Sequence, residues 1–137
     1  MLITCALLLA GCGSSGWATP GAYDIVDGIA AELKISEAGE LLVENRYGGG
    51  SLSSTPSTHV AVIAGETATE TLRASLTSAG FTLESDDGPR SSWTRSYGAQ
   101  VSVTLLSLDS GDSAGIGAES DFQVEQPGAA IWIDSYD

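Results

Sequence analysis

Few side chains in this sequence have the type and spacing that catalysis requires. His59 is the sole histidine, and no Gly-x-Ser-x-Gly motif marks a nucleophile that it could activate. A single histidine at the start of an apolar strand is typical of a structural residue whose hydrogen bonds are satisfied. Asp86 and Asp87 would supply two carboxylates for glycosidase-type acid–base chemistry, but neighbouring side chains in a turn diverge into solvent. We therefore predict no catalytic residues.

A second group of carboxylates has the chemistry of a calcium ligand set. It lies within a stretch rich in glycine and serine and comprises Asp109, Asp112, Glu119, Asp121 and Glu125. Hard oxygen donors on a flexible loop suit Ca²⁺. An EF-hand starting at Asp109 would have Gly111 third and Ser120 twelfth, so that motif does not fit. A solvated acidic loop is favoured, and a weak calcium site formed by Asp109, Asp112, Glu119 and Asp121 is the alternative.

Four aromatic residues form two pairs with a spacing of four. The pairs are Trp93 with Tyr97 and Trp132 with Tyr136, and on a strand each pair falls on one face. On an uncovered face these rings would form a ligand face for a glycan or a partner protein. The favoured interpretation is that they fill the core beneath the helices.

The N-terminal twelve residues, MLITCALLLAGC, contain the most specific pattern. Leu2 to Leu9 form an apolar segment that is too short to span a bilayer. It is followed by Leu9-Ala10-Gly11-Cys12, in which an aliphatic and two small residues precede a cysteine. This segment resembles the signal peptide and lipobox of bacterial lipoproteins. It departs from their pattern in having no basic residue before Lys34, and an upstream start of the gene would supply those residues.

The resemblance implies cleavage between Gly11 and Cys12 and a diacylglyceryl group on the Cys12 thiol. The mature chain would be anchored to the extracytoplasmic face of the cell membrane, and two acyl chains make such an anchor effectively permanent. Residues 13–19 would form a flexible tether of about 25 Å when fully stretched. The remaining segments are similar in their order to those of small lipoproteins of high-G+C bacteria, without a motif that assigns a named family.

Composition limits the class of partner. The chain has 5 Lys+Arg against 18 Asp+Glu, a formal net charge of −13. Such an anionic chain cannot neutralise phosphates, so nucleic acid is excluded as a partner. With one histidine, and with Cys12 acylated, Cys/His metal sites lack ligands, and we expect no cofactor.

Periodicity predicts a single domain over residues 20–137. Helical spacing indicates helices over 20–34 and 67–79, the second with a capping box from Thr67 to Glu70 and a terminating Gly80. Strands are expected at 40–47, 59–64, 81–85, 92–97, 101–105 and 129–135, with a bulge at Leu105-Leu106 and an acidic loop over 109–128. Hairpin-length connections favour an α+β two-layer sandwich, with a mainly antiparallel sheet and two helices on one face.

These observations favour a lipid-anchored envelope protein with a non-enzymatic binding or accessory domain. An envelope protein or a glycan is the expected partner. Two alternatives remain open, a hydrolase that acts on envelope polymers through its acidic residues and a calcium-dependent binding module.

Overall fold

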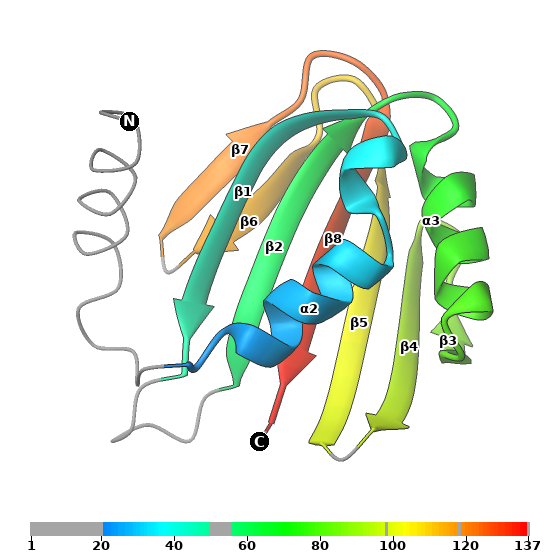
Figure 1. The fold of residues 1–137 in the computed structure, drawn as a ribbon. Coiled ribbons are helices and arrows are strands. Elements are labelled where there is room, and N and C mark those ends of the chain that lie inside the picture. The colour runs from blue at the N-terminus through cyan, green and yellow to red at the C-terminus, as the bar shows by residue number, and fades with distance from the viewer. Residues whose placement is uncertain (1–20, 50–55, 98, 118, 137) are drawn as a thin grey trace, which may run out of the picture.

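The computed structural model describes residues 21–49, 56–97, 99–117 and 119–136. The predicted signal peptide, Cys12 and the tether lie outside these residues. A six-stranded antiparallel sheet forms the centre of the molecule (Figure 1). Its strands, in spatial order, are β1 (Glu40–Gly48), β2 (Ser57–Ala64), β8 (Gly128–Ser135), β5 (Ala99–Leu108), β4 (Arg90–Tyr97) and β3 (Thr82–Asp86). The expected α+β class and antiparallel sheet are confirmed.

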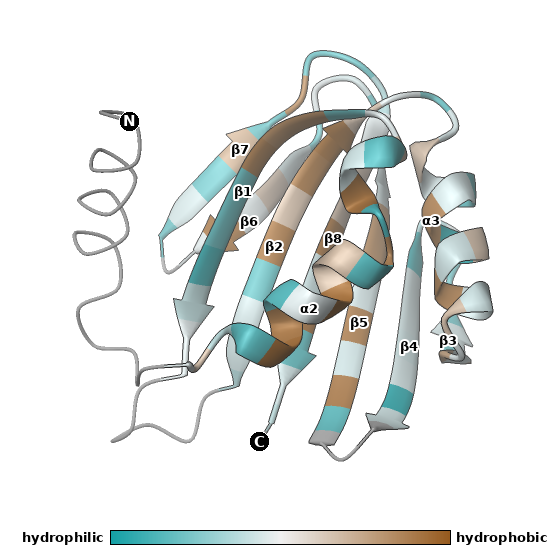
Figure 2. Cartoon of the chain, viewed as in Figure 1, coloured by the Kyte–Doolittle hydropathy of each residue, from teal (hydrophilic) through white to brown (hydrophobic). Residues whose placement is uncertain are grey.

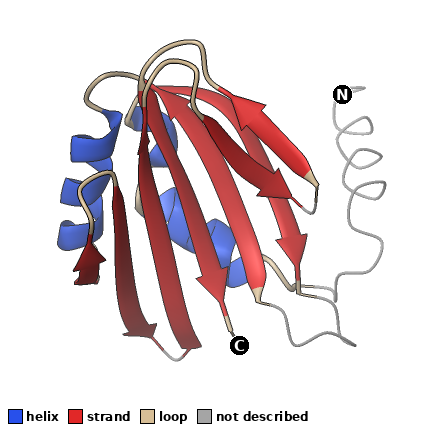
Figure 3. Cartoon of the chain, turned by 180° about the vertical axis from the view of Figure 1, so that it is seen from behind, coloured by secondary structure: helices blue, strands red, loops and turns tan. Residues whose placement is uncertain are grey.

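Both helices cover one face of this sheet, as the view from behind shows (Figure 3). Helix α2 (Asp24–Glu32) runs across β2 and β8, and the short 3-10 helix η1 (Ile35–Glu37) follows it. Helix α3 (Ala68–Ser78) packs on β5 and β8. The apolar stripes of both helices bury Val26, Ile29, Leu72 and Leu76 in one core against the sheet.

The opposite face carries a two-stranded hairpin where the sequence predicted an acidic loop. Strands β6 (Ser113–Gly117) and β7 (Ser120–Gln123) pair with each other and pack over part of the large sheet (Figures 1 and 3). A second apolar core lies beneath them and contains Val62, Leu108, Ala114, Val124 and Ala130. The loop prediction is therefore wrong. The β6–β7 hairpin adds a partial layer, on the other face of the sheet, to the expected arrangement of helices on a sheet.

Coverage of both faces explains the apolar runs in the central strands. All eight residues of β2 are buried, and apolar residues follow one another along its upper half (Figure 2). Leu105 faces the helices whereas Leu106 packs on the hairpin side, and the pairing of β5 is regular there. The bulge expected at these two leucines is thus absent. Irregular positions lie instead in β1, between Leu41 and Val43, in β3, between Leu83 and Ser85, and in the hairpin strand β6, between Gly115 and Gly117.

The helix ends differ in part from the sequence prediction. Helix α3 ends as expected, because Gly80 adopts a φ of +89° and the Phe81 amide donates to the Leu76 carbonyl, a Schellman motif. Its start has no capping box, since the Thr67 side chain makes no cap hydrogen bond. The end of α2 is followed by Lys34 at a φ of +54°, the only non-glycine residue with positive φ among those described. None of the described helices has the length and apolar character needed to cross a bilayer.

Candidate functional site

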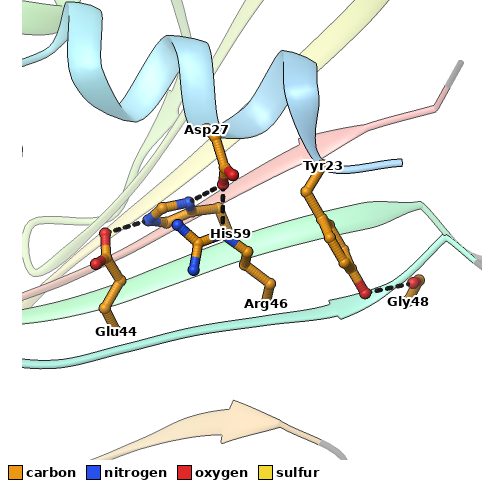
Figure 4. A network of polar contacts seen from close by, with 6 residues as sticks. All are labelled: Tyr23, Asp27, Glu44, Arg46, Gly48 and His59. Carbon is orange, nitrogen blue, oxygen red and sulfur yellow. Dashed lines mark hydrogen bonds and ion pairs between the residues drawn. The ribbon is translucent and has the colours of Figure 1, made fainter. Parts of the chain in front are cut away.

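The His59 side chain lies between helix α2 and strand β1 and is 2% exposed. Its Nδ1 atom is 2.8 Å from Oδ1 of Asp27 on α2. Its Nε2 atom is 2.6 Å from Oε2 of Glu44 on β1. Figure 4 shows the ring held between these two carboxylates, which we call the Asp27–His59–Glu44 bridge. The prediction of a hydrogen-bonded structural histidine is confirmed.

Strand register places these side chains together. His59 is the direct partner of Arg46, and Glu44 is the partner of Ala61, so Glu44 and Arg46 point to the helix side of the sheet. The Nε of Arg46 donates to the same Asp27 oxygen that contacts His59, at 2.6 Å (Figure 4). One carboxylate oxygen on α2 therefore joins the helix to both strands.

The two histidine contacts require a specific count of protons. A neutral imidazole has one N–H donor and one acceptor nitrogen, whereas an ionised carboxylate only accepts. Both ring nitrogens meet carboxylate oxygens, so each contact needs its own proton. The bridge therefore holds either an imidazolium between two carboxylates or a neutral ring with one protonated carboxyl.

A cleft of about 400 Å³ opens beside this bridge. We call it the His59 cleft. Its lining includes the charged residues Lys34, Glu37 and Arg46 and the apolar side chains of Ala30, Ala31, Ile35 and Leu41, together with the bridge itself. The carboxylates of Asp27 and Glu44 remain 39% and 35% exposed, so solvent reaches the edge of a network whose centre is buried. This volume suits a small ligand.

The chain has no match among family models, curated proteins or solved structures.

A second polar group lies on the other face of the sheet. The Thr58 hydroxyl donates to Oδ1 of Asp134 at 2.5 Å. Burial raises the pKa of the Asp134 carboxyl, and the Thr58 hydrogen bond partly opposes that rise. Burial also raises the pKa of Tyr47, with a further increase from the charge of Asp134. The Asp134 carboxyl thus lies on the hairpin side of the sheet, where its ionised form is poorly solvated.

The four aromatic residues, for which a ligand face was the alternative to core filling, do not share one face of the sheet. Trp93 is 4% exposed in the core under the helices, where its Nε1 donates to the Ser91 hydroxyl. Trp132 points to the opposite face, and its Nε1 donates to the Gly115 carbonyl of the hairpin at 2.9 Å. Tyr136 is exposed just beyond β8, and the side chain of Tyr97 lies outside the described part. The core interpretation is confirmed for Trp93, and Trp132 anchors the hairpin.

Two of the acidic residues proposed for hydrolysis or calcium, Asp86 and Asp112, are engaged in local contacts. Asp86 accepts from the Gly88 amide and pairs with Arg73, and these contacts lower its pKa, the reverse of what a general acid needs. Asp112 accepts from the Asp109 amide and closes a turn. Asp121 lies opposite Gly115 in the hairpin. Among the described residues no group of three or more potential ligands is placed to hold a metal ion.

Sequence reasoning identified His59 but missed its three partners. Asp27, Glu44 and Arg46 precede His59 by 32, 15 and 13 residues in the chain. The closeness of Glu44 and Arg46 to His59 follows only from the pairing of β1 with β2. The alternation of Glu44 and Arg46 on one strand was the available signal. It could not show which face they occupy, because the bulge between Leu41 and Val43 reverses the facing of the residues that follow.

Proposed function

We propose that this protein is a lipid-anchored domain of the cell envelope with a non-enzymatic binding role. Its lipid would be a diacylglyceryl group on Cys12, and residues 13–19 would tether the α+β domain at the extracytoplasmic face of the membrane. The Leu9-Ala10-Gly11-Cys12 pattern supports the anchor.

The bridge favours binding over catalysis. A general base needs a free lone pair within reach of the substrate. The His59 ring is almost completely buried, and both of its nitrogens contact carboxylates. The ring therefore fixes Asp27 and Glu44 in place, which is the role of a positioning residue.

We propose that the His59 cleft is the binding site and that its ligand carries a carboxylate or phosphate group. The observation that carries this proposal is the state of Arg46. Its Nε is fixed on Asp27, while its two terminal amino groups have no hydrogen-bond partner among the described residues, and the side chain is 41% exposed. A planar fork held in this way matches a two-oxygen anionic group. Lys34 lines the same cleft and adds a second positive charge.

The net charge of −13 does not prevent local recognition of an anion. Three carboxylates also line the cleft, but Asp27 is paired with Arg46 and His59, and Glu44 is paired with His59, so that only Glu37 lies outside this network. Charges beyond the Debye length of about 8 Å at physiological ionic strength are largely screened. Apolar lining from Ala30, Ala31 and Leu41 would contact the body of the ligand. An acidic sugar of an envelope glycan or a carboxylate of an envelope protein satisfies both requirements.

The anchor is tested by fractionation. Cells that express the wild-type chain or Cys12→Ser are labelled with a palmitate analogue and separated into membrane and soluble fractions. We expect labelled wild-type protein in the membranes and unlabelled Cys12→Ser outside them. An unlabelled wild-type chain, or a label that persists in Cys12→Ser, would contradict the anchor.

The cleft is tested by NMR titration with matched probes. Galacturonate and galactose differ in a carboxylate, and acetate and inorganic phosphate test the anionic group alone. We expect galacturonate, but not galactose, to shift the His59 ring and α2 amide signals. Arg46→Gln and Lys34→Met should each weaken binding by at least about tenfold, the loss expected for one charged hydrogen bond. Absence of a shift with all three anions would show that the cleft is not an anion site.

A further inference from the structure

The Asp27–His59–Glu44 bridge joins three elements through a single ring. His59 belongs to β2, Asp27 to α2 and Glu44 to β1. Strand β1 is also held to β2 by backbone pairing along its length, from Glu40 to Gly48. Helix α2 has no such pairing and is held to the sheet by side chains. Its apolar face is fixed in the core by Val26 and Ile29, and the bridge adds polar contacts at Asp27. Of the three elements, α2 is therefore the one whose local position the bridge can change most.

Several elements contribute the groups that surround the His59 ring. Helix α2 contributes Asp27, and its N-cap residue Tyr23 donates its hydroxyl to the Gly48 carbonyl at 2.9 Å (Figure 4). Strand β1 contributes Glu44 and Arg46, and β8 contributes the apolar Ile133 beside the ring. Lys34, between α2 and η1, and Glu37 in η1 also line the cleft.

The two carboxylates differ in how well they tolerate loss of the ring proton. Oδ1 of Asp27 also accepts from Arg46, so it keeps one donor if the proton on Nδ1 leaves. The contact of Oε2 of Glu44 is with His59 alone among the described residues. A ring with one proton therefore keeps it on Nε2, facing Glu44, because Oε2 of Glu44 would otherwise lose its only protein donor among the described residues, whereas Asp27 keeps Arg46. The lost contact is then the one to α2.

We propose that His59 is a proton-operated latch that holds α2 over the His59 cleft. With a proton in each contact, the ring joins α2 to β1 and the latch is closed. Loss of one proton leaves Nδ1 as an acceptor facing the Asp27 carboxylate, so the two lone pairs repel and α2 loosens at this point. The latch would regulate access to the His59 cleft. Its purpose rests on the proposed function, although the latch itself operates without a ligand.

The latch is tested on the full chain in detergent micelles, without a histidine tag and without ligand. Because His59 is the sole histidine, its ring nitrogens give one set of NMR signals. Amide hydrogen exchange of α2 is measured across the same pH range, from about 5 to about 9, with α3 as the internal reference. Rates are corrected for the intrinsic dependence of exchange on pH.

We expect exchange in α2, relative to α3, to rise by at least about tenfold at the pH at which the ring signals change. His59→Gln and Asp27→Asn should both abolish this step. Three results would overturn the latch: ring signals that do not change across the range, a ring change with no step in α2, or a step that persists in His59→Gln. Failure of the anion titration with a normal step would instead reject the proposed ligand and leave the latch standing.

Discussion

Nε2 of His59 lies 2.6 Å from Oε2 of Glu44, so an imidazole side chain that is 2% exposed contacts a carboxylate whose side chain reaches solvent. Together with Asp27 on the other ring nitrogen, this contact makes a polar network at the wall of the cleft. A buried polar network of this kind is sensitive to the loss of any member, because the remaining groups are left unpaired.

Removal of the Glu44 charge should lower stability. Glu44→Gln replaces an ionised acceptor with a neutral amide, and we expect the free energy of unfolding to fall by about 1.5 kcal/mol. Glu40→Gln is the matched control, since Glu40 is an exposed carboxylate on the same strand, and its effect should stay within about 0.5 kcal/mol. Urea denaturation measures both. Equal effects of the two variants would show that the Glu44 contact contributes nothing specific.

Lys34 should be a strained residue. Its φ of +54° places a long side chain in the left-handed region, which costs about 1 kcal/mol for a non-glycine residue. We expect Lys34→Gly to raise the free energy of unfolding by about 0.5–1 kcal/mol. Lys34→Ala keeps a Cβ and the strain, so it should give no such gain. If both variants are stabilised equally, the strain is not at this backbone position.

Asp134 should make stability depend on pH. Its pKa is raised in the folded protein, so the folded state binds a proton more readily than the unfolded chain. Stability attributable to this group is therefore present in acid and is lost as pH rises from about 4, the unfolded pKa, through the raised folded pKa. We expect Asp134→Asn to be more stable than wild type at about pH 7, with the difference disappearing near pH 3.

Thr58→Val is the companion to this measurement. The Thr58 hydroxyl stabilises the ionised Asp134, so its removal should raise the pKa of Asp134 further and extend the affected window to higher pH. Thermal denaturation at several pH values measures the effect. A stability difference between wild type and Asp134→Asn that is the same at every pH would contradict the assigned cause.

Gly28 offers a test of helix α2 itself. A Cβ at this position would meet no atom within 4 Å, and the residue lies in the interior of the helix. We therefore expect Gly28→Ala to increase stability by about 0.5–1 kcal/mol, since alanine is the better helix former. The midpoint of urea denaturation measures this gain. A loss of stability would show that α2 does not pack as described.

Much of the sheet and both helices could be predicted from the sequence, because the spacing of apolar residues that indicates each of them lies within one short segment. The strand over 59–64 and the helix over 67–79 have apolar spacing that leaves little ambiguity, and each lies within two residues of its observed bounds. The β6–β7 hairpin was missed because its acidic, glycine-rich sequence hides the apolar contacts of Ala114 and Val124.

The candidate site could be predicted from the sequence only in part. A sole histidine in an apolar strand indicated a buried residue that needed partners, and the structure confirms that. Its partners depend on long-range register and on an irregularity in β1 that reverses the facing of Glu44 and Arg46. No local pattern encodes such a reversal.

The central claim, a domain held at the membrane by Cys12, is tested most directly by intact mass spectrometry of the protein extracted from native membranes. We predict a chain that begins at Cys12, lacks residues 1–11 and carries the added mass of a diacylglyceryl group on that residue. A chain that retains residues 1–11 and has an unmodified Cys12 would contradict the account.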